Sequence, residues 1–275
     1  MKGSAGRAGP PADRRVDASS PAVPAATLVP MRDGERGPEV LLLRRNLTSG
    51  FVPGAYVFPG GRVDAADASP AALAKLDALT PARAAERLGL THGDPPAIAY
   101  YVAALREAFE ETGLLVAVTR DGRPAPTAAG DEETSRVRDE LMEGRLDFGD
   151  ALECLGCRIA GDSIEYLAHW ITPEAEPRRY DTRFFAAAVL GGAEPSLDAR
   201  EMTHALWIRP SLAVRRADRG ELRMILPTVR TLEQLAGFPD TADALRYLSR
   251  RSPPTIMPTL RITPSGARSR SEDHG

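Results

Sequence analysis

The stretch Arg106 to Leu114, REAFEETGL, determines how the rest of the sequence is interpreted. In a helix over 97–112, Glu107, Glu110 and Glu111 gather near the C-terminal end, opposite a stripe of apolar side chains. The helix macrodipole is negative at that end, so each carboxylate costs about 0.3 to 1 kcal/mol there. The acidic face therefore predicts a compensating cation. A hard divalent ion such as Mg²⁺ is held by carboxylate oxygens, waters and substrate phosphates.

A glycine-containing loop, Phe58-Pro59-Gly60-Gly61, lies upstream of this helix. Two consecutive glycines allow the backbone to turn tightly or to approach a ligand closely, because neither residue has a Cβ atom. The alternative interpretation of the three glutamates is a solvated acidic face on a surface helix, and the helix sequence alone would favour it. The combination of the loop and the acidic helix favours a site.

Composition limits the class of protein. The chain has 275 residues, 43% of them hydrophobic and 27% charged, which is enough for one large domain, with or without an elaboration. The net charge of -3 argues against a nucleic-acid partner. No apolar run is long enough to span a bilayer, and the first 22 residues lack the apolar region of a signal peptide. These features predict a cytoplasmic protein without a membrane partner.

The only two cysteines, Cys154 and Cys157, are spaced as CxxC. A zinc site normally needs four ligands, and no second cysteine or histidine pair at metal spacing is present in the sequence. We therefore expect two reduced side chains in a helix.

Hydrophobic patterns predict an α/β fold with a mixed sheet. Expected strands cover 25–31, 39–45, 114–119, 165–172, 183–190 and 202–208, and the first two form a hairpin with a loop at 33–38. Expected helices cover 70–79, 82–88, 97–112, 211–219, 228–237 and 241–250, with a helical pair over 132–157 that is broken at 144–149. The domain is expected over 25–250, with helical insertions at about 68–96 and 132–160. The ends, 1–24 and 251–275, are expected to be a disordered tail and an extended or disordered tail.

The motif residues resemble the box of the Nudix hydrolases, G-x5-E-x7-R-E-U-x-E-E-x-G-U, in which U is a bulky aliphatic residue. The matching residues are Gly61, Arg106, Glu107, Ala108, Glu110, Glu111, Gly113 and Leu114. Two departures stand out. Asp67 occupies the place of the first glutamate, and the 38 residues 68–105 replace the usual seven. The resemblance implies a Nudix-type α/β/α sandwich with helical insertions.

The split box resembles the branch that includes the peroxisomal coenzyme A diphosphatases. Further likenesses to that branch lie at 41–45, 54–61, 170–173 and 181–185. The stricter coenzyme A signature, LLTxR[SA]x3Rx3Gx3FPGG, is only partly kept, because Leu43, Asn46 and Gly50 replace its Thr, its Ser or Ala, and its second Arg. These departures concern the substrate rather than the fold.

The resemblance implies a metal-dependent hydrolase of a small nucleoside diphosphate derivative. Glu107, Glu110 and Glu111 would ligate Mg²⁺ or Mn²⁺. Coenzyme A or acyl-coenzyme A would be cleaved to adenosine 3′,5′-bisphosphate and 4′-phosphopantetheine or its acyl form. The alternatives are a pyrophosphatase acting on NADH or ADP-ribose, and a Nudix-like module that binds a nucleotide without cleaving it. A homodimer is left open.

Further residues receive expected roles. One glutamate of the box, or Glu201 from a later loop, would orient or deprotonate the attacking water, although an ordinary loop residue is the alternative for Glu201. Arg106 is expected to brace a glutamate rather than to touch substrate. Arg45 would bind a phosphate, or alternatively pair with an aspartate, and Gly60 and Gly61 would approach the diphosphate.

Four other residues keep two interpretations each. Asp64 and Asp67 either support the glycine loop or complete the metal site. Trp170 and Phe184 either stack on an adenine or belong to the core.

Overall fold

The computed structural model describes residues 21–48, 52–190, 192–198, 200–262 and 268–271, and it describes side chains as far as residue 259. Most of the predicted N-terminal tail, 1–24, therefore lies outside the described residues. The first strand begins at Val23, two residues before the predicted domain boundary.

The central sheet has eight strands and is mixed. Its strands are β1 (Val23–Gly34), β2 (Gly37–Arg45), β3 (Tyr56–Val57), β4 (Gly60–Arg62), β8 (Glu165–Ile171), β9 (Tyr180–Ala188), β10 (Met202–Ile208) and β11 (Thr255–Ile256). The order is β10-β2-β1-β9-β8-β11, with β3 paired to β2 and β4 paired to β1. The β1–β9 and β8–β11 pairs are parallel and the others antiparallel. The predicted mixed sheet is confirmed.

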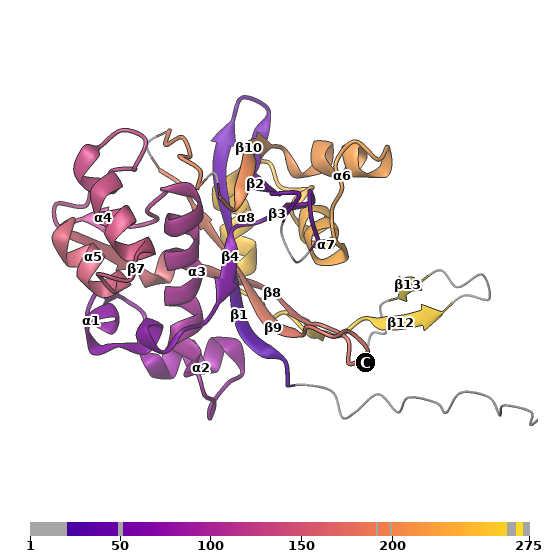
Figure 1. Ribbon diagram of the computed structural model, residues 1–275, viewed down its shortest axis with the longest axis horizontal. Coiled ribbons are helices and arrows are strands. Elements are labelled where there is room, and N and C mark those ends of the chain that lie inside the picture. Colours follow the sequence, from indigo (N-terminus) through magenta and orange to yellow (C-terminus); the bar gives the residue numbers. More distant parts are fainter. Residues whose placement is uncertain (1–20, 49–51, 191, 199, 263–267, 272–275) are drawn as a thin grey trace, which may run out of the picture.

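Helices cover both faces of this sheet (Figure 1). One layer contains α1 (Pro70–Leu73), α2 (Pro81–Leu88), α3 (Ala97–Thr112), α4 (Glu132–Met142) and α5 (Phe148–Cys154). The other contains α6 (Pro210–Asp218), α7 (Leu226–Leu235) and α8 (Thr241–Leu248). Strand β1 contributes side chains to the hydrophobic clusters on both faces of the sheet. Ala26 and Leu28 belong to the cluster around α3, whereas Val29 and Met31 belong to the cluster around α7 and α8. This is the expected α/β/α sandwich.

Helix α3 lies at the centre of the first layer. It ends where predicted, at Gly113, whose φ of 66° is left-handed and whose N–H donates to the carbonyl of Phe109 at 2.8 Å. Fourteen of its 16 residues are buried, so the predicted single apolar stripe was too narrow. The insertions explain the difference, because they cover the side of the helix that faces away from the sheet.

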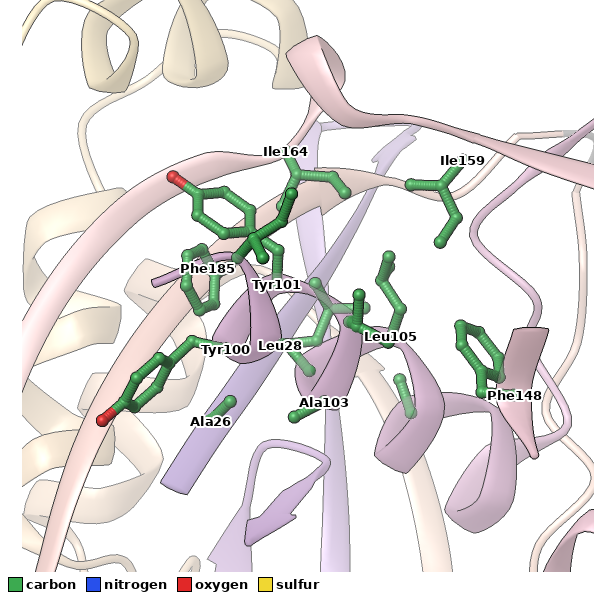
Figure 2. Close-up of a cluster of buried hydrophobic side chains, with 14 of the residues drawn as sticks. Ala26, Leu28, Tyr100, Tyr101, Ala103, Leu105, Phe148, Ile159, Ile164 and Phe185 are labelled. Atoms are coloured by element: carbon green, nitrogen blue, oxygen red, sulfur yellow. The ribbon is translucent and has the colours of Figure 1, made fainter. Parts of the chain in front are cut away.

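The two insertions cover the side of α3 that faces away from the sheet, and Figure 2 shows part of the resulting core. Tyr101 packs against Phe185 of the sheet in a tilted arrangement with ring centroids 4.4 Å apart, while Phe148 of α5 approaches Phe109. The insertions also form a small sheet, ordered β5 (Leu76–Asp77), β7 (Cys157–Ala160) and β6 (Val118–Thr119). The 3₁₀ turns Ala65–Ala68 and Gly161–Ser163 precede α1 and β8.

Four local predictions were wrong because tertiary pairing or turn geometry overrides local pattern. The strand expected over 114–119 forms only at Val118–Thr119, where β6 pairs with β7. The helix expected over 70–79 ends at Leu73, and β5 follows because it pairs with β7. Cys157 lies in β7 rather than in a helix, for the same reason. The loop expected at 33–38 is a tight turn, because Gly37 has a φ of 109° and lets both strands continue to Gly34 and Gly37.

The C-terminal segment adds β11 to the edge of the sheet. Beyond it, β12 (Thr259–Ile262) and β13 (Arg268–Ser271) form a hairpin that extends away from the sandwich (Figure 1). Parts of the predicted extended or disordered tail, 251–275, lie outside the described residues. Among the helices of the described ranges, none has the length and apolar content needed to cross a bilayer.

Candidate active site

The glycine loop and the acidic helix meet where β1 changes partner. Strand β1 pairs with β4 along Ala25–Thr27 and with β2 along Met31–Gly34. At this fork the N–H of Gly60 donates to Oε2 of Glu111 at 3.1 Å. A Cβ atom on Gly61 would lie 2.4 Å from the carboxylate carbon of Glu107, so this position requires glycine as long as the carboxylate stays there. The two halves of the split motif are therefore in contact.

Arg106 joins the two halves by hydrogen bonds. Its Nε and Nη2 atoms donate to the two oxygens of Asp67 at 2.8 and 3.1 Å, and Nη2 also donates to the carbonyl of Arg62 at 2.9 Å. Its Nη1 donates to Glu107 at 3.0 Å and Glu110 at 3.2 Å. Asp67 in turn accepts from the N–H of Asp64. Arg106 thus fixes the loop and the helix together, with its guanidinium fork paired to the Asp67 carboxylate.

The site is short of positive charge despite Arg106. Burial, and then the neighbouring carboxylate of Glu110, raise the pKa of Glu107 to about 7, although Arg106 opposes the rise. Burial and the charge of Glu107 raise the pKa of Glu111 well above its usual range, against the hydrogen bond from Gly60. Burial also raises the pKa of Glu110. Three carboxylates next to one another are thus difficult to ionise without more positive charge.

A pocket of about 490 Å³ opens beside this cluster. Several predicted residues line it, namely Arg45, Gly60, Gly61, Glu107, Glu111, Trp170, Phe184 and Glu201. Others do not, namely Asp64, Asp67, Arg106 and Glu110. Trp170 and Phe184 are 4% and 7% exposed, so both belong to the core while one side of each faces the pocket. No lining residue comes from the insertion at 68–96.

The donor chemistry of the pocket suits a hard divalent cation. Within the described ranges, no three or more His, Cys, Asp or Glu side chains already converge as a metal cluster. Glu107 and Glu110 are ion-paired with Arg106, and Glu111 accepts from Gly60. Glu107 and Glu111 nevertheless line one pocket together with Glu201. Burial raises the pKa of Glu107 and of Glu111, and a bound cation would favour their ionised forms. The ligand roles of Glu107, Glu110 and Glu111 stay predictions.

The sequence analysis missed several residues at the site. Arg62 and Arg178 line the pocket; Arg62 directly follows the glycine pair and could have been noticed, whereas Arg178 lies in a polar turn without a pattern. Arg138 of α4 donates from Nε and Nη2 to the carbonyl of Glu110, at 3.0 and 2.6 Å. It places a buried positive charge at the C-terminal end of α3, and no spacing in the sequence indicates this contact.

Comparison with known proteins agrees with this geometry. A family model described as the NUDT19 Nudix domain matches residues 79–235, which is more than half of the chain. A crystal structure of a NUDIX hydrolase from Alicyclobacillus acidocaldarius is 30% identical, with a TM-score of 0.65, and the match covers 82% of this chain and 96% of that one.

Curated relatives have similar names. The acyl-coenzyme A diphosphatase NUDT19 of Gallus gallus is 29% identical over 246 residues, covering 78% of this chain and 65% of the relative. The putative nudix hydrolase 7 of Caenorhabditis elegans is 30% identical over 225 residues, covering 81% of this chain and 64% of the relative. The chain thus spans slightly less than two thirds of the length of these two proteins. The family match, the sandwich and the contact between Gly60-Gly61 and the helix carboxylates together show that this chain belongs to the Nudix family, in the branch described as the NUDT19 Nudix domain.

Proposed function

We propose that this protein hydrolyses the diphosphate bond of coenzyme A or an acyl-coenzyme A with the help of Mg²⁺ or Mn²⁺. The products are adenosine 3′,5′-bisphosphate and 4′-phosphopantetheine or its acyl form. The observation that carries the proposal is the packing of Gly60 and Gly61 against Glu111 and Glu107 at one end of a ligand-sized pocket. The names of the acyl-coenzyme A diphosphatase relatives support the choice of substrate.

The chemistry follows from the donors at that end. Glu107, Glu110 and Glu111 would hold the ion. When bound, a divalent cation neutralises charge on the diphosphate oxygens and lowers the pKa of a bound water. Glu201 or one of the three glutamates orients or deprotonates that water for attack on phosphorus.

The surrounding residues position the substrate. Gly60 and Gly61 leave the backbone open to close approach by the diphosphate, because a side chain at either position would collide with its neighbours. Arg45 binds a phosphate oxygen at the same end of the pocket. Arg106 does not touch substrate; it holds Glu107 and Glu110 in place through Nη1.

A turnover assay tests the proposal. The purified protein is incubated with Mg²⁺ or Mn²⁺ and coenzyme A, an acyl-coenzyme A, NADH or ADP-ribose. We expect coenzyme A or its acyl form to have the highest kcat/KM, and Glu111→Gln to reduce it by about 100-fold or more, as for loss of a catalytic carboxylate. Glu140→Gln is the matched control, since Glu140 lies on α4 and pairs with Arg136.

Each outcome has a clear meaning. A higher kcat/KM for NADH or ADP-ribose would replace the proposed substrate with that of the alternative pyrophosphatase. Cleavage of none of these compounds would favour a binding module. Equal activity of Glu111→Gln and the wild-type protein would refute the assigned carboxylate.

A further inference from the structure

Two arginines of the pocket take no part in the reaction described above. Arg62 and Arg178 both line the pocket and are exposed. Neither side chain forms a hydrogen bond or an ion pair with any residue in the described ranges. Arg106, the buried arginine next to this pocket, by contrast donates hydrogen bonds to three carboxylates. The two exposed guanidinium groups are therefore available to an anionic ligand.

Strand register places Arg62 close to the reacting end of the pocket. Gly60 pairs with Thr27, which pairs with Phe184, and two residues along β4, Arg62 pairs with Ala25. At about 3.3 Å per residue, the Cα atoms of Gly60 and Arg62 are about 7 Å apart. Arg62 is thus close enough to the diphosphate position to reach a second group on the same nucleoside.

Next to Arg62, the pocket is lined by small side chains and then by an aromatic one. Ala25 pairs with Thr182 of β9, and Thr182 pairs with Trp170 of β8, so these side chains share the face of the sheet that carries Arg62. The two intervening side chains are small, and both line the pocket. The surface between Arg62 and Trp170 has room for a sugar and a flat ring. Arg178 lies in the turn that joins β8 to β9, next to the same row of residues, and lines the same pocket.

We propose that Arg62 and Arg178 form a second anion site, which binds a phosphate monoester carried on the ribose of the substrate nucleoside. The inference rests on the proposed function and refines it. A guanidinium group forms paired hydrogen bonds with a phosphate, which makes arginine suited to this task. Coenzyme A carries such a group on its 3′-oxygen, whereas NADH and ADP-ribose do not. The second site therefore selects diphosphates with a 3′-phosphorylated nucleoside.

The test compares coenzyme A with 3′-dephospho-coenzyme A as substrates. The kcat/KM for coenzyme A is divided by the kcat/KM for the 3′-dephospho form. This ratio is measured for the wild-type protein, Arg62→Gln, Arg178→Gln and the double variant. Charged hydrogen bonds to a phosphate are worth about 10-fold or more in binding, so we expect the ratio to fall at least 10-fold in the double variant. The matched control is Arg215→Gln, because Arg215 is exposed on α6, outside the pocket. A ratio in the double variant within twofold of the wild-type value would overturn the proposal.

A binding experiment separates this inference from the proposed function. Calorimetry measures the affinity for adenosine 3′,5′-bisphosphate and for adenosine 5′-monophosphate, which requires no turnover. A preference for the bisphosphate that disappears in the double variant supports the second site even if coenzyme A is not cleaved, in which case only the proposed function fails. Equal affinities in the wild-type protein would overturn the second site even if coenzyme A is a good substrate.

Discussion

Two groups of charged side chains at the site differ in how far the protein itself compensates their charges. In the carboxylate cluster, Arg106 is 7% exposed and contacts Asp67, Glu107 and Glu110. In the arginine pair, Arg62 and Arg178 are exposed and form no such contacts with described residues. A buried charge without a partner destabilises the fold, whereas an exposed one does not. The carboxylate cluster is therefore tied to stability, and the arginine pair is free to serve specificity.

The largest expected effect is on stability, at Arg106. Arg106→Met leaves Asp67, which is 1% exposed, as a buried carboxylate without its partner. Breaking a buried ion pair by removing one side costs about 3 to 5 kcal/mol. We expect a loss of this size in the free energy of unfolding, measured by urea denaturation. Arg62→Met serves as the control, and an equal loss there would contradict the contrast between the carboxylate cluster and the arginine pair.

Alanine substitutions at the two glycines sharpen the same comparison, because one is expected to lower stability and the other to lower activity. A Cβ atom on Gly60 would lie 2.5 Å from the backbone oxygen of Ala26, so Gly60→Ala should cost about 2 to 3 kcal/mol of stability through overpacking. On Gly61 its nearest neighbours would be the carboxylate atoms of the Glu107 side chain, which can move. Gly61→Ala should therefore lose about 10-fold or more in kcat/KM while costing less stability than Gly60→Ala. The reverse order of the two stabilities would contradict the geometry at the fork.

Glu107 provides a pH-dependent test. Its pKa is raised to about 7 from 4.5, so its contribution to stability is complete below pH 4.5 and is lost as the pH rises through 7. With the metal removed by a chelator, Glu107→Gln should be more stable than the wild type at pH 8 by about 3 kcal/mol, and the difference should fall to about 1 kcal/mol or less near pH 5. Denaturation at both pH values, with a chelator present, measures this. An equally stable variant at pH 8 would show that Arg106 already compensates the carboxylate.

The smallest effect concerns the insertion at 68–96. Arg87 of α2 forms an ion pair with Glu165 of β8, which is 6% exposed. Arg87→Met should destabilise the protein by about 1 to 2 kcal/mol. Because no residue of the insertion lines the pocket, kcat/KM should stay within twofold of the wild-type value. A large fall in kcat/KM at a temperature where the variant is folded would show that the insertion shapes the site.

The sequence predicted the features that depend on local pattern. The acidic helix and its end at Gly113 follow from spacing and from glycine, and so does the approach of Gly60-Gly61 to that helix once the motif is recognised. Features that depend on long-range packing could not be predicted in this way. The strand containing Cys157 forms because β5 and β6 pair with it, and Arg138 reaches Glu110 from a separate helix. No local pattern encodes either contact.

The central claim is that Glu107 and Glu111 hold a divalent cation next to the glycine pair. It is tested most directly by crystals grown with Mn²⁺, whose position is located by anomalous diffraction. The account predicts an anomalous peak within bonding distance of carboxylate oxygens of Glu107 and Glu111, beside Gly60 and inside the pocket. A protein that cleaves coenzyme A with Mn²⁺ but binds the ion away from both carboxylates would contradict the account.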